Sequence, residues 1–358
     1  MVALDAGLVG WQRPKIMETT PPKWSIDIHR ARRLRTRGLG IMSSATKDIT
    51  NALSIDLEDW GQSALGTDLP ITTRVVRNTD RILALLDRHR VRATFFALGK
   101  VCERFPKLLP TIASAGHEIG THGYGHELVY SISPDHFRAD LQLSIAIIAA
   151  QIGRRPIGYR APAFSITRQS LWAGPIMAEL GIKYSSSIFP IAGRRYGIPD
   201  APRFPFRWST CDLIEFPLST LRRCNRNLPV CGGGYLRLLP GAILSSAIRE
   251  VNRLHHPAVV YMHPYELDIA EPAVLRRNGW PITWRKFATQ SMFRGRVAGR
   301  LGKLLSAFRF APLADVLGIA PDVTVNEKVR HARSLPILEF VDQKPSLPHA
   351  LTGRLAGP

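Results

Sequence analysis

The feature that most constrains this chain is a regular alternation, over residues 52–263, of short apolar runs with longer amphipathic stretches. Apolar runs rich in β-forming residues predict strands, and amphipathic stretches predict helices. Strands that alternate with helices form parallel sheets. We therefore predict an α/β fold with a parallel sheet closed into a barrel. The seven expected strands are Ala52–Asp56, Ala93–Leu98, Glu118–His122, Gly158–Pro162, Lys183–Ser187, Leu213–Leu218 and Ala258–His263.

Helical periodicity fills most of the gaps between these strands. The sequence predicts helices over Arg74–Arg88, Lys100–Ala115 and Asp135–Ile152. In the first of them, Val75 and Ile82 fall on one face, as they do in a helix that packs on a sheet.

The remainder of the 358 residues flanks the barrel. Segments that lack sustained periodicity are predicted to be irregular or disordered. Met42 follows the basic N-terminal cluster and offers an alternative start. We expect a basic, disordered extension over residues 1–47 and a barrel over 48–270. A C-terminal helical extension over 271–319 is expected to pack on the barrel, and a mobile tail should follow over 320–358. Within the extension, residues 287–317 show a basic amphipathic helix pattern.

The composition is that of a globular protein, with 45% hydrophobic and 21% charged residues, but the net charge is +20. Such a charge favours an anionic partner. The flanks, residues 1–47 and 271–358, carry +14 of it, so the barrel itself is only mildly basic. No nucleic-acid-binding motif is visible, and we expect no nucleic-acid partner. The basic flanks leave a peripheral contact with the inner-membrane surface as an open alternative.

The cysteines and the apolar runs indicate the compartment. The four cysteines form no CxxC pair, which argues against a disulfide framework or a structural zinc module. No apolar run has the length of a membrane span, and the N-terminus lacks the order of a signal peptide. We expect a cytoplasmic protein.

Three carboxylates stand within four residues at the end of the first strand, in the segment Ser54-Ile-Asp-Leu-Glu-Asp59. Carboxylates this close raise each other's pKa unless a cation or an arginine is present. A metal ion would relieve the repulsion. The alternative is a solvated acidic turn.

Two histidines, His122 and His126, follow the third strand in Glu118-Ile-Gly-Thr-His-Gly-Tyr-Gly-His126. Neutral imidazole and carboxylate suit Zn²⁺ and similar metals. A chance surface pair is the alternative for such a spacing on its own. Because the carboxyl ends of barrel strands meet at one face, we expect the histidines and the acidic segment to share one ion.

Two further strand ends carry Arg160 and His263. Arg160 could orient a carboxylate through paired, charge-assisted hydrogen bonds, or lie in an ordinary surface salt bridge. His263 ends a strongly apolar strand, where it is either functional or a buried structural histidine.

These motifs together resemble the carbohydrate esterase family 4 (NodB-homology) polysaccharide deacetylases. The resemblance implies an irregular (β/α)7 barrel. More narrowly, the chain is similar to the deacetylases associated with exosortase/PEP-CTERM exopolysaccharide systems. The segments that carry the resemblance, between about Ala52 and Leu317, are SIDLEDW, ATFFALG, GHEIGTHGYGH, GYRAPAFSI, SSSIFPI, RYGIPDAP, GGGYLRLLP and YMHPYELD.

The resemblance assigns a role to each matching residue. Asp56 corresponds to the catalytic base, Arg160 to the arginine that orients it, and His263 to the general acid. His122 and His126 correspond to the metal-binding histidines. The backbone N–H of Ala163 corresponds to a donor to the oxyanion.

The carboxylate ligand is less determined, because the family usually has two adjacent aspartates and this sequence has Asp-Leu-Glu-Asp. In an extended strand Asp56 and Glu58 share one face, which favours Glu58. If the strand ends at about Leu57, Asp59 can swing inward, and we favour Asp59 on that ground. Ser185 stands where the subgroup often has an aspartate, so a charge relay through this position is not expected.

The resemblance implies metal-dependent hydrolysis of N-acetyl groups on a bacterial exopolysaccharide or its oligosaccharide precursor. One divalent ion is expected, Zn²⁺ in preference to Co²⁺ or another metal. The alternatives are a small-molecule amidase of the same fold and a non-catalytic polysaccharide-binding module. The joint presence of Asp56, Arg160 and His263 argues against the binding module, which needs no such set.

Overall fold

The computed structural model describes residues 49–319, except 67, 194 and 231, together with Ile337–Leu338. The expected disordered extension over 1–47 and most of the tail over 320–358 lie outside the described residues. The strands are β1 (Thr50–Leu57), β2 (Thr94–Ala97), β3 (Glu118–Thr121), β4 (Gly158–Tyr159), β5 (Tyr184–Ser185), β6 (Phe206–Trp208), β7 (Ile214–Glu215), β8 (Thr220–Arg223), β9 (Arg226–Pro229), β10 (Val259–Met262), β11 (Arg309–Ala311) and β12 (Ile337–Leu338).

One curled sheet contains most of these strands, in the order β10-β1-β2-β3-β4-β5-β7-β6-β12, and β11 pairs with the first residues of β1. Every pair is parallel except β6 with β7. Within the described residues the strands at the two ends of this order, β10 and β12, do not pair with each other. The sheet therefore forms an irregular, open barrel, as the resemblance implied.

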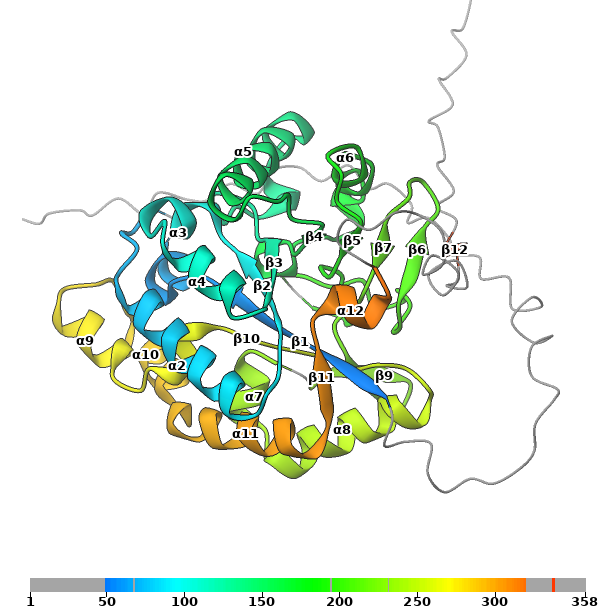
Figure 1. Ribbon diagram of the computed structural model, residues 1–358. Helices are drawn as coiled ribbons and strands as arrows, with labels where there is room; N and C mark the ends of the chain where they lie inside the picture. Colours follow the sequence, from blue (N-terminus) through cyan, green and yellow to red (C-terminus); the bar gives the residue numbers. More distant parts are fainter. Residues whose placement is uncertain (1–48, 67, 194, 231, 320–336, 339–358) are drawn as a thin grey trace, which may run out of the picture.

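Helices surround the outside of this sheet (Figure 1). None of those in the described ranges combines the length and the apolar character needed to cross a bilayer. The α-helices are α2 (Arg74–Arg88), α3 (Gly99–Arg104), α4 (Leu108–Ser114), α5 (Pro134–Ile152), α6 (Ala173–Glu179), α7 (Gly234–Leu238), α8 (Gly241–Arg253), α9 (Glu271–Arg277), α10 (Trp284–Ser291), α11 (Val297–Ala307) and α12 (Leu313–Leu317). The short 3-10 and π turns are η1 (Gly61–Leu65), η2 (Val129–Ser131), η3 (Pro162–Phe164), η4 (Arg168–Ser170), η5 (Pro264–Leu267) and η6 (Arg294–Arg296).

The predicted strands are all present, although most are shorter than expected. The predicted helix Arg74–Arg88 is confirmed at both ends, and Val75 and Ile82 are buried in the core. The predicted helix Lys100–Ala115 is instead two helices, α3 and α4. Pro106 lies between them, and a proline inside a helix removes a backbone hydrogen bond and disfavours helical geometry before it.

The expected amphipathic helix over 287–317 is also divided. Phe293 adopts a left-handed conformation (φ 60°), which ends α10, and residues 309–311 leave the helical path to pair with β1 as β11. Helix α12 then crosses the amino-terminal end of the sheet. The backbone N–H of Leu313 donates to Thr94 Oγ1 (2.7 Å) and that of Ala314 to Glu118 Oε2 (3.2 Å). The amino-terminal end of the barrel is thereby covered.

The C-terminal extension is tied to the loop after β10 by Arg294, which is 1% exposed. Its guanidinium donates to the carbonyl oxygens of Tyr265 (2.8 Å) and Asp268 (2.9 Å) and to Glu271 Oε2 (3.0 Å). It also lies against the ring of Trp60, 5.1 Å from the ring centroid. Because an unpaired buried charge is costly, Arg294 and Glu271 depend on each other.

We expect Arg294→Met to lower the free energy of unfolding by about 3 kcal/mol, because it leaves Glu271 buried without a cation. Urea denaturation followed by circular dichroism measures this. Arg296→Met is the matched control, because Arg296 is exposed, and it should cost less than about 0.5 kcal/mol. The double variant Arg294→Met/Glu271→Gln should recover part of the loss. Equal losses in the two single variants would contradict the expectation.

Candidate metal and catalytic site

The candidate residues come together at the carboxyl-terminal end of the barrel. Glu58 follows β1, His122 follows β3, Arg160 follows β4 and His263 follows β10. Asp56 is the penultimate residue of β1. Because these strands are parallel neighbours, their ends meet on one face, as the sequence predicted.

A carboxylate and two imidazoles converge within this face. Glu58 Oε2 lies 2.8 Å from His126 Nε2 and 3.4 Å from His122 Nε2, and all three side chains are buried. One ligand atom from each residue lies within 4.8 Å of the others. Two imidazoles and a carboxylate are the donors of many catalytic zinc sites, which keep a further position open. The residues present therefore fit one divalent metal ion.

The orientation of His122 is fixed by the neighbouring strand end. Its Nδ1 lies 2.8 Å from the backbone carbonyl oxygen of Arg160. A carbonyl only accepts, so Nδ1 carries a proton, and Nε2 is the nitrogen left to bind a metal. The imidazole is thus held in the tautomer that binds a metal.

Asp140, on α5, shapes the turn that carries His126 and was not found from the sequence. Its carboxylate accepts from the backbone N–H groups of Tyr124 (2.8 Å) and Gly125 (2.9 Å). His126 itself is left-handed (φ 64°), a conformation that is unfavourable for a residue with a side chain. An aspartate in the middle of an amphipathic helix gives no sequence signal of this role.

The structure does not bring Asp59, the favoured carboxylate ligand, to the two histidines, and places Glu58 there instead. The Asp59 carboxylate accepts from the backbone N–H (2.7 Å) and the hydroxyl (3.2 Å) of Thr72, away from the histidines. Burial raises the pKa of Asp59 to about 6, although the Thr72 hydrogen bonds oppose this. Strand β1 does end at Leu57, but the Glu58 N–H bonds back to the Asp56 carbonyl (3.0 Å) in a tight turn. Glu58 rather than Asp59 therefore faces the histidines.

Burial alone would raise the pKa of Glu58, but the imidazoles of His126, His122 and His263 hold it well below its ordinary range. The carboxylate is therefore ionised in its buried position, the form in which a carboxylate binds a metal.

Asp56 is held by the fully buried Arg160. The guanidinium donates to Asp56 Oδ1 (2.8 Å) and to Ser54 Oγ (2.6 Å). On its other side it donates to the carbonyl (2.9 Å) and the hydroxyl (2.8 Å) of Ser186. The surface salt bridge considered for Arg160 is excluded, and its proposed contact with Asp56 is present. The ion pair fixes the Asp56 carboxylate at the base of the site.

His263 lies across the Asp56 and Glu58 carboxylates from Arg160. Its Nε2 is 3.4 Å from Glu58 Oε1 and 3.9 Å from Asp56 Oδ2, while Nδ1 lies 3.2 Å from Glu266 Oε1. The ring stacks on Tyr265, with centroids 4.7 Å apart. Burial lowers the pKa of His263, but the hydrogen bond to Glu266 and the charges of Glu58, Glu266 and Asp56 raise it to about 9. The imidazole thus faces the site with a partner on each nitrogen.

Ala163 lies in the turn η3, directly after the strand end that carries Arg160. Ala163 (φ 49°) and Phe164 (φ 54°) are both left-handed. Such strain in non-glycine residues persists only where the surrounding structure enforces it, and it is concentrated at functional sites. Pro162 and the packed ring of Phe164 hold this turn beside the site.

A buried carboxylate, Glu215, lies beside the segment that contacts Arg160 and was not predicted from the sequence. Glu215 is fully buried on β7, opposite Ser185 in the strand register, and its Oε1 accepts from the N–H groups of Ser187 (2.7 Å) and Ile188 (2.8 Å). Ser187 Oγ accepts in turn from the Ala161 N–H (2.9 Å). Ser185 therefore has a buried carboxylate beside it, supplied by the neighbouring strand.

Comparison with known families agrees with this geometry. Residues 68–185 match the family model described as polysaccharide deacetylase, and residues 186–318 match a model described as a domain of unknown function, DUF3473. Residues 68–185 are thus similar to the polysaccharide deacetylases.

The curated relatives are similar over part of their length. A peptidoglycan-N-acetylglucosamine deacetylase of Bacillus cereus is 36% identical over 96 residues, which are 26% of this chain and 35% of the relative. A peptidoglycan deacetylase of Helicobacter pylori is 31% identical over 108 residues, 30% of this chain and 36% of the relative. The chain therefore spans about a third of the length of these relatives.

A solved structure shows the same fold. A protein of Mycobacterium smegmatis described as a candidate polysaccharide deacetylase is 19% identical, with a TM-score of 0.54, over 87% of this chain and 99% of that one. The comparison supports the irregular barrel with its extension.

We expect Glu58→Gln to lose most metal affinity, because a neutral amide is a poor ligand, whereas Asp59→Asn retains it. Isothermal titration of Zn²⁺ into chelator-treated protein measures both. Asp59→Asn is the matched control, since it makes the same change one residue along the chain. A greater loss in Asp59→Asn would return the ligand role to Asp59.

Proposed function

We propose that this protein is a metal-dependent deacetylase that hydrolyses N-acetyl groups of a glycan to acetate and a free amino sugar. The observation that carries the proposal is the convergence of three groups on one barrel face. These are the Asp56–Arg160 pair, the cluster of Glu58, His122 and His126, and His263. The family match over residues 68–185 supports it.

The site formed by Glu58, His122 and His126 would hold the ion that acts as the electrophile. A divalent ion bound by Glu58 and the two histidines, Zn²⁺ in preference to Co²⁺, would polarise the acetyl carbonyl and lower the pKa of a bound water. Asp56, held by Arg160, would accept the proton of the attacking water. The N–H of Ala163 would donate to the oxyanion.

The departing amine needs a proton, because an amide anion is a very poor leaving group. His263 stands across the carboxylates from Arg160, and its Nδ1 contact with Glu266 orients Nε2 toward the site. His263 would donate the proton from Nε2 as the carbon–nitrogen bond breaks. Asp56 gains one proton and His263 gives up one, so the cycle closes by proton return through solvent.

The wider setting is proposed on the sequence alone. The subgroup motifs favour a bacterial exopolysaccharide, or its oligosaccharide precursor, processed on the cytoplasmic side. We also propose that the basic flanks make a peripheral contact with the inner membrane.

Acetate release from N-acetylchitotetraose tests the activity. We expect release by the purified protein, loss of release after treatment with a chelator, and recovery on addition of Zn²⁺ or Co²⁺. Binding of the sugar without release would instead favour the binding module, and release only from small amides would favour the amidase.

Asp56→Asn should lower kcat by about 10³-fold while leaving the metal content near that of the unmodified protein, because Asp56 acts as a base. Acetate release and elemental analysis measure the two effects. His126→Ala is the comparison variant and should lose the metal. If Asp56→Asn loses as much metal as His126→Ala, Asp56 is a ligand rather than the base.

A further inference from the structure

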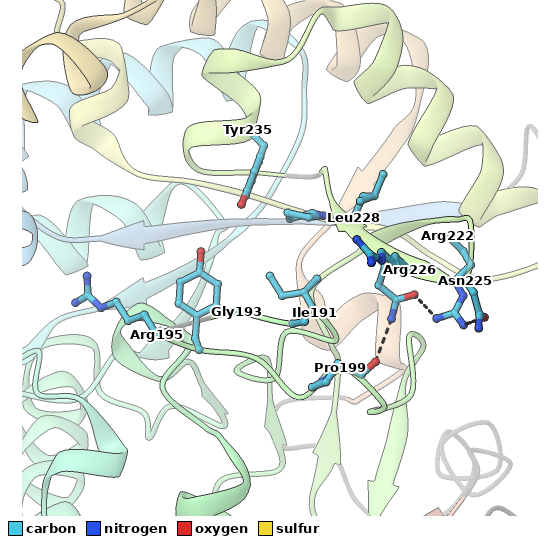
Figure 2. Close-up of a pocket in the computed structure, with 13 residues that line it drawn as sticks. Ile191, Gly193, Arg195, Pro199, Arg222, Asn225, Arg226, Leu228 and Tyr235 are labelled. Carbon is cyan, nitrogen blue, oxygen red and sulfur yellow. Dashed lines mark hydrogen bonds between the residues drawn. The ribbon is translucent and has the colours of Figure 1, made fainter. Parts of the chain in front are cut away.

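A cavity of about 700 Å³ lies beside the β8–β9 hairpin (Figure 2). One wall is formed by residues 191–193, Arg195, Tyr196 and Pro199, a second is the hairpin, and the third carries Tyr235 from α7. Figure 2 shows Arg195 at one end of the cavity and Arg222 with Arg226 at the other. The proposed mechanism uses none of these residues.

The charge of this cavity is of one sign. Among the residues that the structure describes, its lining includes Arg195, Arg222 and Arg226 but no aspartate or glutamate. Within the part of the chain that the structure describes, none of these three arginines has a carboxylate within salt-bridge distance. Arg223, on the same hairpin, differs because it pairs with Glu250 at 2.7 Å. Guanidinium groups gathered in a concave surface concentrate a positive potential, which attracts anions.

The hairpin orients Arg222 through neutral partners. Its guanidinium donates to the side-chain oxygens of Asn227 (2.9 Å) and Asn225 (2.5 Å). Asn227 in turn donates to the carbonyl oxygen of Pro190 (2.7 Å), which ties the hairpin to the segment before the cavity wall. The arginine is positioned without its charge being neutralised, so it remains available to carboxylate or phosphate oxygens.

Two tyrosines provide an amphipathic surface between the arginines. Tyr196 and Tyr235 both line the cavity, and the ring of Tyr196 stacks on Phe189 with centroids 5.9 Å apart. Gly233 (φ 50°), just before α7, lies so close to Tyr261 that a Cβ would meet its hydroxyl at 2.7 Å. This close approach fixes the start of the helix that carries Tyr235. Rigid tyrosines present flat faces and a polar tip, which suit the rings and hydroxyls of a sugar.

A smaller hollow beside His126 shares a lining residue with this cavity. This hollow, of about 400 Å³, is lined by Gln62, Leu128 and Ile132 among others, and by both His126 and Arg195. Arg195 therefore borders both hollows, and His126 is a residue of the metal cluster. A chain with its acetamido group at the cluster can extend past Arg195 into the larger cavity.

We propose that the larger cavity binds a negatively charged part of the glycan, so that the substrate is an anionic oligosaccharide carrying carboxylates or phosphates. This inference rests on the proposed deacetylase function and names its substrate class. Arg195, Arg222 and Arg226 bind the anionic groups, and the tyrosines contact the sugar rings. The acetylated residue then lies at the metal cluster, beyond Arg195.

Calorimetric titration of the full chain tests this with three probes, which are neutral N-acetylchitohexaose, hyaluronan hexasaccharide and N-acetylchitotriose 1-phosphate. We expect at least one anionic probe to bind about tenfold more tightly than the neutral chain at low ionic strength, and the advantage to shrink as salt is added. The tighter of the two anionic probes identifies carboxylate or phosphate as the charged group. Equal binding of all three probes would overturn the proposal.

The double variant Arg222→Gln/Arg226→Gln should lose the preference for the anionic probe. Arg223→Gln is the matched control, because it removes one charge from the same hairpin at a residue that pairs with Glu250 and does not line the cavity. The control should keep the preference. If Arg223→Gln lowers it as much as the double variant, the effect is one of general charge and the proposed site is wrong.

The binding measurement does not depend on turnover, so the two proposals can fail separately. Charge-selective binding without acetate release from any probe would overturn the deacetylase function and leave the anionic site standing. Acetate release from the neutral and anionic chains at the same kcat/KM, with no charge-selective binding, would overturn the anionic site and leave the deacetylase function standing.

Discussion

The site depends on one buried cation, Arg160. Its guanidinium has no access to solvent, so it must be surrounded by acceptors. Ser54 and Asp56 supply them from β1, and Ser186 supplies them from the end of β5. A buried charge without a partner is strongly destabilising, which makes the position of Asp56 a requirement of folding as well as of chemistry. The backbone carbonyl of the same residue fixes His122. One arginine thus links the proposed base to the metal cluster.

The site is assembled from three stretches of sequence. Residues before the first family match supply Asp56 and Glu58, and the polysaccharide deacetylase match supplies the histidines and Arg160. The segment that matches DUF3473 supplies His263, and Glu215 behind the Ser187–Ala161 contact. That segment is therefore part of the site rather than an appendage. Its buried Arg294 holds the backbone of Tyr265 and Asp268, which follow His263 directly.

Sequence periodicity predicted the parallel sheet and the strand ends, because buried strands need apolar runs and barrel chemistry lies where those runs stop. Asp56, His122, Arg160 and His263 were found in this way. The choice between Glu58 and Asp59 could not be predicted, because it depends on a tight turn at Asp56 and on Thr72, thirteen residues further on. Glu215 could not be predicted for a similar reason, because its role depends on the pairing of β5 with β7. Pairing across strands leaves no local pattern in either segment.

The net charge of +20 lies mainly in the flanks, and this was one reason to expect no nucleic-acid partner from the sequence. The positive charge of the barrel is, however, not evenly spread over its surface. Arg168 pairs with Asp200, Arg138 with Glu179 and Arg223 with Glu250, whereas the arginines of the cavity face one another across an acid-free lining. A small excess of positive charge can thus be concentrated in one hollow beside the site. The local field, rather than the net charge of the domain, then decides which ligands are attracted.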